Sequence, residues 1–207
     1  MSINKKEVSR AVVSRLPNYY RFLSNLEKSG LVRISSQELG NLMGLTASQI
    51  RQDMNCFGGF GQQGYGYNVM ELRRHIGEVL GLTRKYSMVI VGAGNIGQAV
   101  AGYNGFRKMG FSVEALFDEK PKDNVRPVSE LAQYVRENNT DIGVIAVPEH
   151  AAQAVCDTLC ANGIKAIWNF APVNLVVPQH VILRSVHLSD ALLVLSYYMK
   201  NDFTKGE

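Results

Sequence analysis

The residues best suited to binding chemistry lie between positions 88 and 100, where a short apolar run passes into Gly92, Gly94 and Gly97. The spacing Gly-x-Gly-x-x-Gly between a strand and a helix is typical of a dinucleotide-binding turn. The first glycine permits a tight turn, the second lets a pyrophosphate approach the backbone, and the third lets helix and strand pack closely. The phosphates would meet N–H groups at the start of the helix. The residues expected to contact the ligand are Gly92, Ala93, Gly94, Asn95, Ile96 and Gly97.

An acidic residue further along supports this prediction. The apolar run 113–117 ends in Asp118, 26 residues after Gly92, which is somewhat beyond the roughly 20 expected for a ribose-binding carboxylate. We expect Asp118 to accept hydrogen bonds from the adenosine ribose of NAD(H) and to repel a 2′-phosphate, although Lys120 nearby carries the opposite charge. A glycine-rich loop without any ligand is the alternative interpretation.

Apolar runs and helical stretches alternate from residue 88 onward. The apolar runs are 88–91, 113–117, 142–147 and 164–168, and the helical stretches are 96–109, 128–138 and 151–162. This alternation predicts a Rossmann-type α/β domain with a parallel sheet, to which the segment 176–186 could add an edge strand. Ligands of such sheets sit at the carboxyl ends of the strands. The residues at those ends are Gly92, Asp118, Val147, Pro148, Asn169 and Phe170.

The N-terminal part shows the pattern of a helix-turn-helix. A helix over 8–30 is followed by a short helix after the N-cap Ser35, a turn with Gly44, and another helix after Thr46. The last helix has an apolar stripe and a polar face whose Arg, Gln and Asn side chains suit base edges. The predicted DNA contacts on it are Ser48, Gln49, Arg51, Gln52 and Asn55. An ordinary solvated amphipathic helix is the alternative.

The next segment favours DNA binding. Residues 57–69, called the wing below, contain five glycines with aromatic residues between them. This composition suits a tight hairpin that lies against a phosphate backbone or enters a minor groove, whereas a flexible linker would contain fewer aromatics. The predicted DNA contacts of the wing are Gly61, Gln62, Gln63, Gly64 and Tyr65. We therefore expect an α+β winged-helix DNA-binding domain over residues 1–85.

Charge is divided unequally along the chain. Residues 1–85 hold twelve Lys or Arg and six Asp or Glu, a net charge of +6, whereas residues 86–207 hold ten and twelve, a net charge of −2. This excess indicates a polyanionic partner for the first part. No apolar run reaches the roughly 18 residues of a membrane span. Three cysteines predict no disulfide framework and no metal site, and they fit the cytoplasm.

The last segment, 189–200, is apolar nearly all round. Such a helix needs burial on several sides, so we expect it to pack into a partner subunit of a homodimer. A groove of its own chain is the alternative. The predicted divisions are a DNA-binding domain over 1–85, a Rossmann domain over 86–186 and a C-terminal dimerisation helix over 187–207.

Taken together, these residues resemble the Rex family of redox-sensing transcriptional repressors along almost the whole chain. The resemblance is carried by residues 35–39, 49–53, the wing, 92–97, Tyr103, 117–118, 146–148, 168–173 and 195–198. It implies a homodimer with a domain-swapped C-terminal helix, which represses genes by binding palindromic operator DNA until NADH rises relative to NAD⁺. It also implies a nicotinamide end formed by Tyr103, Val147, Pro148, Asn169 and Phe170.

Some residues depart from the family pattern. Gln62 and Gln63 stand where the wing usually has Lys or Arg, and Gln52 stands where a basic residue is common. His187 replaces an Asp that, in the family, joins a charge network with an Arg of the first helix, matched here to Arg15, and with Tyr103.

Other functions fit parts of the sequence. An NAD-dependent oxidoreductase needs a substrate domain and a proton-transfer group, for which His150 is the one tempting candidate. Residues 1–85 leave no segment for a substrate domain, so we expect a protein that is not an enzyme. Alternatively, residues 1–85 form a protein-interaction module, whose binding would lack the steep salt dependence of phosphate contacts.

Overall fold

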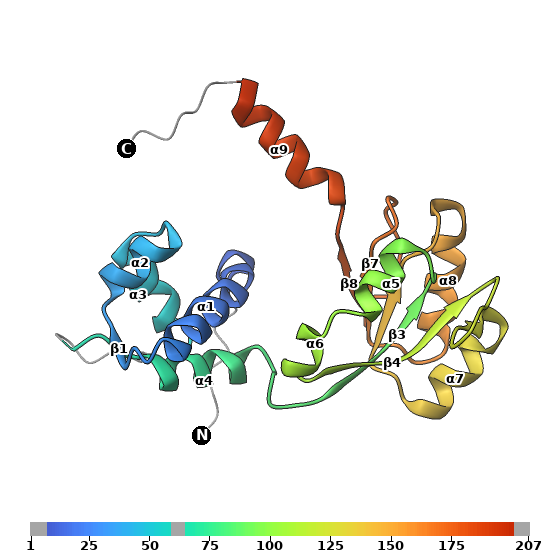
Figure 1. Ribbon diagram of the computed structural model, residues 1–207, viewed down its shortest axis with the longest axis horizontal. Helices are drawn as coiled ribbons and strands as arrows, with labels where there is room; N and C mark the ends of the chain where they lie inside the picture. The colour runs from blue at the N-terminus through green and yellow to red at the C-terminus, as the bar shows by residue number, and fades with distance from the viewer. Residues whose placement is uncertain (1–7, 59–64, 201–207) are drawn as a thin grey trace. The chain divides into compact units, whose positions relative to one another are not determined.

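The computed structural model describes residues 8–58 and 65–200, and the chain divides into two compact units, residues 1–84 and 85–207 (Figure 1). The predicted wing contacts Gly61, Gln62, Gln63 and Gly64 lie outside the described residues. Among the helices of the described part, none has the length and apolar character needed to cross a membrane.

The first unit is built from helices and a small antiparallel sheet. Its elements are α1 (Arg10–Lys28), β1 (Arg33–Ile34), α2 (Ser36–Met43), α3 (Ala47–Asn55), β2 (Tyr67–Asn68) and α4 (Val69–Val79). Its core joins α1, α2, α3 and α4 through buried side chains that include Leu16, Leu39, Ile50 and Leu72. Helix α1 is one continuous element that contains Pro17.

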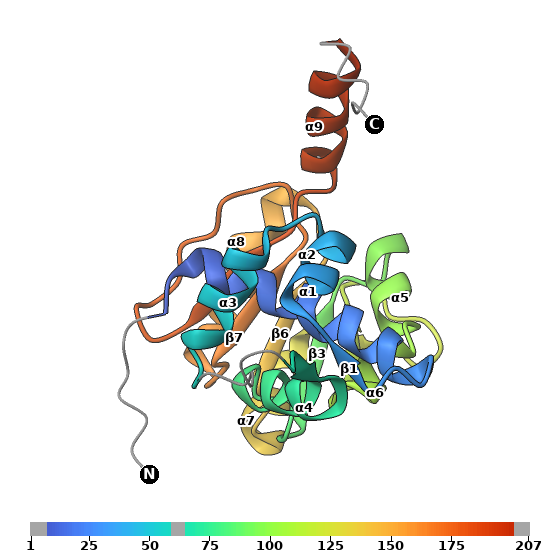
Figure 2. The ribbon, with the colours of Figure 1, turned by 90° about the vertical axis from the view of Figure 1, so that its left-hand side faces the viewer.

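The predicted helix-turn-helix is confirmed in its details. Ser35 and Glu38 form a reciprocal capping box at the start of α2, and the Thr46 hydroxyl accepts a hydrogen bond from the Gln49 N–H at 3.2 Å. Gly44 ends α2 in the left-handed conformation, with φ at 67°. Helices α2 and α3 lie side by side (Figures 1 and 2). At the base of the wing, β1 pairs with β2, with Ile34 opposite Tyr67.

The second unit is a parallel α/β sheet. Its strands are β3 (Tyr86–Val91), β4 (Phe111–Asp118), β5 (Arg126–Pro127), β6 (Ile142–Ile145), β7 (Ala166–Asn169) and β8 (Ile182–Ser185). They lie in the order β5-β4-β3-β6-β7-β8, and every neighbouring pair is parallel. In chain order this is 3-2-1-4-5-6, the Rossmann arrangement. The predicted edge strand is confirmed as β8.

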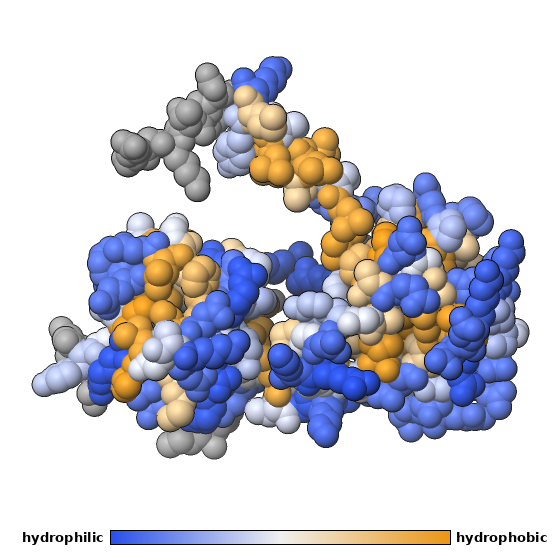
Figure 3. Space-filling view, in the orientation of Figure 1, coloured by the Kyte–Doolittle hydropathy of each residue, from blue (hydrophilic) through white to orange (hydrophobic). Residues whose placement is uncertain are grey.

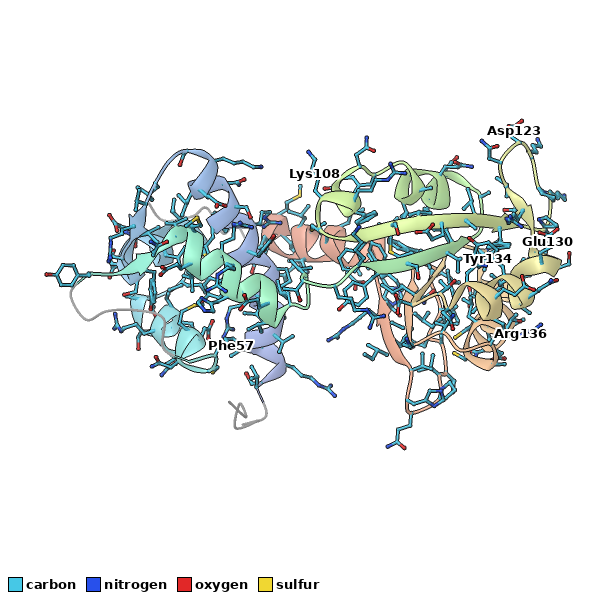
Figure 4. The ribbon with its side chains drawn as sticks, turned by 90° about the horizontal axis from the view of Figure 1, so that it is seen from below. Phe57, Lys108, Asp123, Glu130, Tyr134 and Arg136 are labelled. Atoms are coloured by element: carbon cyan, nitrogen blue, oxygen red, sulfur yellow. The ribbon has the colours of Figure 1, made fainter. Side chains whose placement is uncertain are left out.

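Helices cover both faces of this sheet. One face carries α7 (Leu131–Asn138), which follows the 3₁₀ turn Val128–Glu130, and α8 (Glu149–Ala161). The other face carries α5 (Asn95–Ala101) and α6 (Gly105–Lys108); Figure 4 shows Lys108 on this side and Tyr134 and Arg136 on the α7 side. The helix predicted over 96–109 is therefore wrong as one element. It breaks between 101 and 105, where Gly102 and Asn104 are poor helix formers.

The C-terminal helix α9 (Leu188–Lys200) exposes every one of its residues. Its apolar side chains form the hydrophobic surface seen along it in Figure 3, where Leu192, Leu193, Val194 and Leu195 are between 55% and 66% exposed. The alternative of a groove within its own chain is thus not what the structure shows. So large an exposed apolar surface marks an interaction site.

Candidate nucleotide site and DNA-contacting helix

The glycine turn after β3 uses its three glycines in different ways. Gly92 has φ at 103°, and a Cβ there would lie 2.5 Å from the carbonyl carbon of Ala146. A Cβ on Gly97 would collide with the carbonyl oxygen of Gly92. In contrast, a Cβ on Gly94 would meet no atom within 4 Å. The protein's own packing therefore requires glycine at 92 and 97, whereas at 94 the space is open for a ligand.

The strand order explains where this turn lies. Strands β3 and β6 are neighbours, and the chain leaves them toward opposite sides of the sheet, which makes their carboxyl ends the topological switch point. Gly92 follows β3, and Ala146 follows β6. Ligands of open α/β sheets bind in the crevice at this point. The motif found in the sequence therefore occupies the expected place.

A cavity of about 700 Å³ opens at the switch point. Apolar side chains make up one part of its wall, namely Val91, Ile96, Val128, Val147, Pro148 and Val155. The polar or charged residues along it are Asn95, Asp118, Glu119, Lys120 and His150. A second cavity, of about 620 Å³, shares Gly94, Asp118 and Lys120 with it. An apolar cavity with a few polar groups is the usual form of a cofactor site.

Asp118 stands between the two cavities and is held by backbone donors. Its Oδ2 accepts a hydrogen bond from the Ala93 N–H at 2.7 Å, and its Oδ1 accepts one from the Lys120 N–H at 3.0 Å. These bonds, from Lys120 first and then Ala93, hold the pKa of the carboxyl below its usual range. The side chain is therefore an ionised acceptor fixed at the edge of the glycine turn.

The five residues expected at the nicotinamide end have different surroundings. Val147 and Pro148 line the first cavity. Asn169 is fully buried, and its amide bonds with Ala171, Val173 and Ser185, so this side chain holds the following loop rather than facing open space.

Tyr103 and Phe170 belong to a chain of aromatic contacts next to the sheet. Tyr103 packs on Phe106 with ring centroids 4.7 Å apart, and Phe106 lies 5.7 Å from Trp168. Trp168 then packs on Phe170 at 4.6 Å. Tyr103 nevertheless remains 58% exposed. The fold thus links two predicted residues that are far apart in the sequence.

Several cavity residues were not predicted as ligand contacts. Glu119 and Lys120 follow Asp118 directly, and their position after a strand end could have indicated them. Val128, Ala151 and Val155 carried no local signal. His150, considered in the sequence only as a catalytic base, lines the same cavity. No group of three or more His, Cys, Asp or Glu residues in the described ranges could hold a metal ion.

Helix α3 presents a polar face to solvent. Ser48, Arg51, Gln52 and Asn55 are all exposed, as predicted for contacts with base edges. The Arg51 guanidinium donates a hydrogen bond to the Ser36 hydroxyl at 3.1 Å. Gln49 differs from the others, because its amide donates to the buried Asp53 at 2.9 Å.

The described end of the wing carries an aromatic–arginine pair. Tyr65 is 70% exposed, and the Arg33 guanidinium lies 5.9 Å from its ring centroid. Arg33 also donates a hydrogen bond to the Tyr65 carbonyl at 3.1 Å. Arg33 was not among the predicted DNA contacts, because an arginine in a short strand carries no distinctive signal.

Arg15, which the resemblance matches to a charge network with position 187 and Tyr103, has a partner in its own unit. Arg15 donates two hydrogen bonds to Asp53, at 2.7 and 2.8 Å, within the first unit. These bonds use Nε and Nη2 of the guanidinium, which is 25% exposed, and the charge network with position 187 and Tyr103 stays a prediction.

Comparisons with known proteins agree with this architecture. Residues 7–55 match the family described as "Putative DNA-binding protein N-terminus", and residues 83–173 match the family described as "CoA binding domain". The chain is 53% identical over 203 residues to the redox-sensing transcriptional repressor Rex of Clostridium tetani, covering 94% of this chain and 96% of that protein. It is 54% identical over 200 residues to Rex of Clostridium kluyveri, covering 93% and 95%.

Solved structures of a Rex-family repressor are similar over the whole chain. The crystal structure of RSP in complex with β-NAD⁺ and operator DNA has a TM-score of 0.89 and 48% identity, covering 98% of this chain and 95% of that one. The structure of RSP with β-NADH has a TM-score of 0.87 and 46% identity, covering 96% and 97%.

The fold and the site together define a nucleotide-responsive DNA-binding protein, with a winged helix-turn-helix joined to a Rossmann-type sheet. The chain belongs to the Rex family of redox-sensing transcriptional repressors. Its relatives are named as repressors and not as enzymes, which removes the oxidoreductase interpretation of His150.

Proposed function

We propose that this chain represses transcription by binding palindromic operator DNA as a homodimer, and that NADH binding in the second unit releases the DNA. The observation that carries the proposal is the joint presence of the exposed polar face of α3 and the cavity at the β3–β6 switch point. The similar RSP was crystallised with β-NAD⁺ and operator DNA, and separately with β-NADH, which supports both halves.

The cavity fits a dinucleotide. The open space at Gly94 leaves room for a pyrophosphate against the backbone, and Asp118 offers fixed oxygens for ribose hydroxyls. Asn95 and Ile96 begin α5, where the first N–H groups of a helix lack partners within the helix. We place the nicotinamide near Val147 and Pro148, with Tyr103 and Phe170 beyond them.

The charge of Asp118 also selects among adenine nucleotides. NADP(H) carries a phosphate on its adenosine ribose, and so does coenzyme A, the ligand named for the matching family. An ionised carboxylate beside that ribose would repel either phosphate, because like charges at close range are unfavourable. NAD(H) has free hydroxyls there, so we propose NADH and NAD⁺ as the ligands.

The reduced ligand should be preferred for an electrostatic reason. The nicotinamide ring is cationic in NAD⁺ and neutral in NADH, and an apolar wall disfavours an unpaired charge. NADH switches the protein only if it binds two dimer arrangements unequally, typically by about 1–3 kcal/mol. We propose that the NADH-bound dimer no longer places two α3 helices about 34–36 Å apart, one turn of DNA.

The apolar surface of α9 supports a dimer in which this helix packs into the partner subunit. Such burial would cover side chains that stand exposed in the single chain, including Leu192 and Leu193. The proposed divisions are the DNA-binding domain 1–85, the Rossmann domain 86–186 and the swapped helix 187–207. A repressor acts where operator DNA is, so the proposed location is the cytoplasm.

Parallel titrations test this function. Fluorescence anisotropy of a palindromic operator should be measured with the full chain while NADH, NAD⁺, NADPH and coenzyme A are added separately. We expect NADH to release the DNA at far lower concentration than NAD⁺, with NADPH and coenzyme A without effect. Operator affinity that NADH leaves unchanged would refute the switch, and steady NADH oxidation with a keto acid would restore an enzyme function.

A further inference from the structure

A buried carboxylate joins α1 to α3 in the first unit. Asp53 lies on the inner side of α3 and is 1% exposed. Its Oδ2 accepts hydrogen bonds from Arg15 Nε at 2.7 Å and from the Tyr19 hydroxyl at 2.8 Å. Its Oδ1 accepts from Arg15 Nη2 at 2.8 Å and from Gln49 Nε2 at 2.9 Å. Both oxygens are therefore used, with donors from each helix.

This arrangement constrains the orientation of α3. A guanidinium that donates two parallel hydrogen bonds to one carboxylate fixes direction as well as distance. Tyr19 is fully buried, so the group donating the third bond cannot move far. Burial by itself would raise the pKa of Asp53, but the bonds from Arg15, Gln49 and Tyr19 outweigh it and keep the carboxyl ionised. Rotation of α3 about its axis would break several charged hydrogen bonds together.

The exposed face of α3 depends on that rotation. Ser48, Arg51, Gln52 and Asn55 project from the side of the helix opposite the core. Contacts with base edges need donor–acceptor distances near 2.9 Å, so a small rotation of the helix would misplace all of these side chains at once. The buried carboxylate thus acts on the surface that contacts DNA without touching DNA itself.

Gln49 belongs to the network and not to the exposed face. It lies about 100° around the helix from Ser48, its amide donates to Asp53, and it is half-buried. We propose that Asp53 is a positioning residue for operator recognition, and that Gln49 supports it instead of contacting a base as the sequence suggested. This inference rests on the proposed function, because it assumes that α3 contacts operator DNA.

Two single variants distinguish a residue that supports Asp53 from a residue that contacts a base. Gln49→Ala removes one hydrogen bond to Asp53, and Gln52→Ala is the matched control on the exposed face. Each is titrated against the operator and against duplexes with every base pair of one half-site substituted in turn. We expect Gln49→Ala to weaken binding to all of them by a similar factor, up to about tenfold, with the order of preference intact. Gln52→Ala should flatten the preference at one base pair.

A third variant tests the carboxylate directly. Asp53→Asn keeps the shape of the side chain and removes its charge. We expect the ratio of operator affinity to random-DNA affinity to fall by at least tenfold, while the affinity for random DNA and for NADH stays within twofold. Circular dichroism at the assay temperature checks that the variant is folded. If it is not folded, the affinities of Gln49→Ala for the substituted duplexes test the proposal by themselves.

The outcomes distinguish the inference from the function on which it rests. Loss of preference at a single base pair in Gln49→Ala would mean that Gln49 contacts that base, and it would overturn the inference. An unchanged specificity ratio in folded Asp53→Asn would overturn it as well. If the wild-type chain itself fails to distinguish operator from random DNA, the proposed function fails first.

Discussion

Alanine substitutions at Gly94 and Gly97 should separate ligand binding from folding. Gly94 has φ at −71° and ψ at −171°, a conformation open to any residue, and its Cβ would meet no protein atom within 4 Å. Gly94→Ala should therefore change the stability of the unliganded protein little. In the proposed complex, however, the added methyl group occupies space where the pyrophosphate approaches the backbone.

The magnitude follows from ligand linkage. NADH at 100 times its Kd stabilises the folded state by about 2.7 kcal/mol. The second unit spans residues 85–207, a length at which 1 kcal/mol corresponds to roughly 3–5 °C in Tm. NADH should thus raise the Tm of the wild-type unit by roughly 8–14 °C. A hundredfold loss of affinity in Gly94→Ala would leave about 0.4 kcal/mol, or only 1–2 °C.

Gly97→Ala provides the contrasting control. Its Cβ would collide with the carbonyl oxygen of Gly92 and lie 3.0 Å from the carbonyl carbon, so the turn or α5 must shift. Forcing atoms into a packed site typically costs about 1–3 kcal/mol. We expect a lower Tm for this variant even without ligand, by roughly 3–15 °C.

Differential scanning calorimetry with and without NADH measures both effects. A full NADH-induced rise in Gly94→Ala would show that the pyrophosphate does not pass over Gly94, and the proposed pose would be wrong. A large loss of unliganded stability in Gly94→Ala would show that the protein itself packs against position 94. Either result would refute the proposal that Gly94 serves ligand binding whereas Gly97 serves packing.

Three further predictions concern other parts of the chain. Asp118→Asn removes the charge beside the proposed ribose, so the ratio of NADH affinity to NADPH affinity should fall by about tenfold or more in fluorescence titrations. An unchanged ratio would mean that residues other than Asp118 discriminate between the two nucleotides. The folded pKa of Asp53 lies below the unfolded value of about 3.9, so its stabilisation is present above that pH and is lost as pH falls below it toward the folded pKa. Urea unfolding of the first unit between pH 7 and pH 3 should show this loss of stability, and the Asp53→Asn variant should not show it. At pH 7, Asp53→Asn should lower the free energy of unfolding by about 3 kcal/mol. This is the lower end of the range for a broken buried ion pair, because Arg15 is 25% exposed. Leu193→Glu, on the exposed surface of α9, should convert dimers to monomers in sedimentation experiments and weaken operator binding; a variant that stays dimeric would exclude this surface from the interface.

Local features of this protein were determined by short-range sequence. The N-caps at Ser35 and Thr46, the end of α2 at Gly44 and the polar face of α3 each depend on residues within one or two turns of each other. The packing at Gly97 is likewise local, because its close neighbours, Gly92 and Ile90, belong to the same strand–turn–helix unit. Periodicity and capping express such contacts directly, so the two kinds of domain were predictable.

The tertiary structure alone decided how distant residues meet. The strand order places Ala146 and Val147 beside Gly92, and it brings Val155 and His150 into the cavity. Nothing in the neighbourhood of these residues specifies which strands become neighbours, because that depends on crossovers between separate segments.

Burial of polar residues was the other feature that needed the fold. An aspartate or glutamine on a short polar helix is exposed by default, so the sequence placed Gln49 with the DNA contacts and gave Asp53 no role. Asn169 was placed with the ligand contacts because it lies at a strand end, a position that does not reveal how far its side chain is buried. A charged group is stable inside only when donors from elsewhere surround it, and those donors, Arg15 and Tyr19, lie more than thirty residues away on another helix. Which polar side chains are exposed, and which are buried and hold other elements in place, was therefore decided by packing.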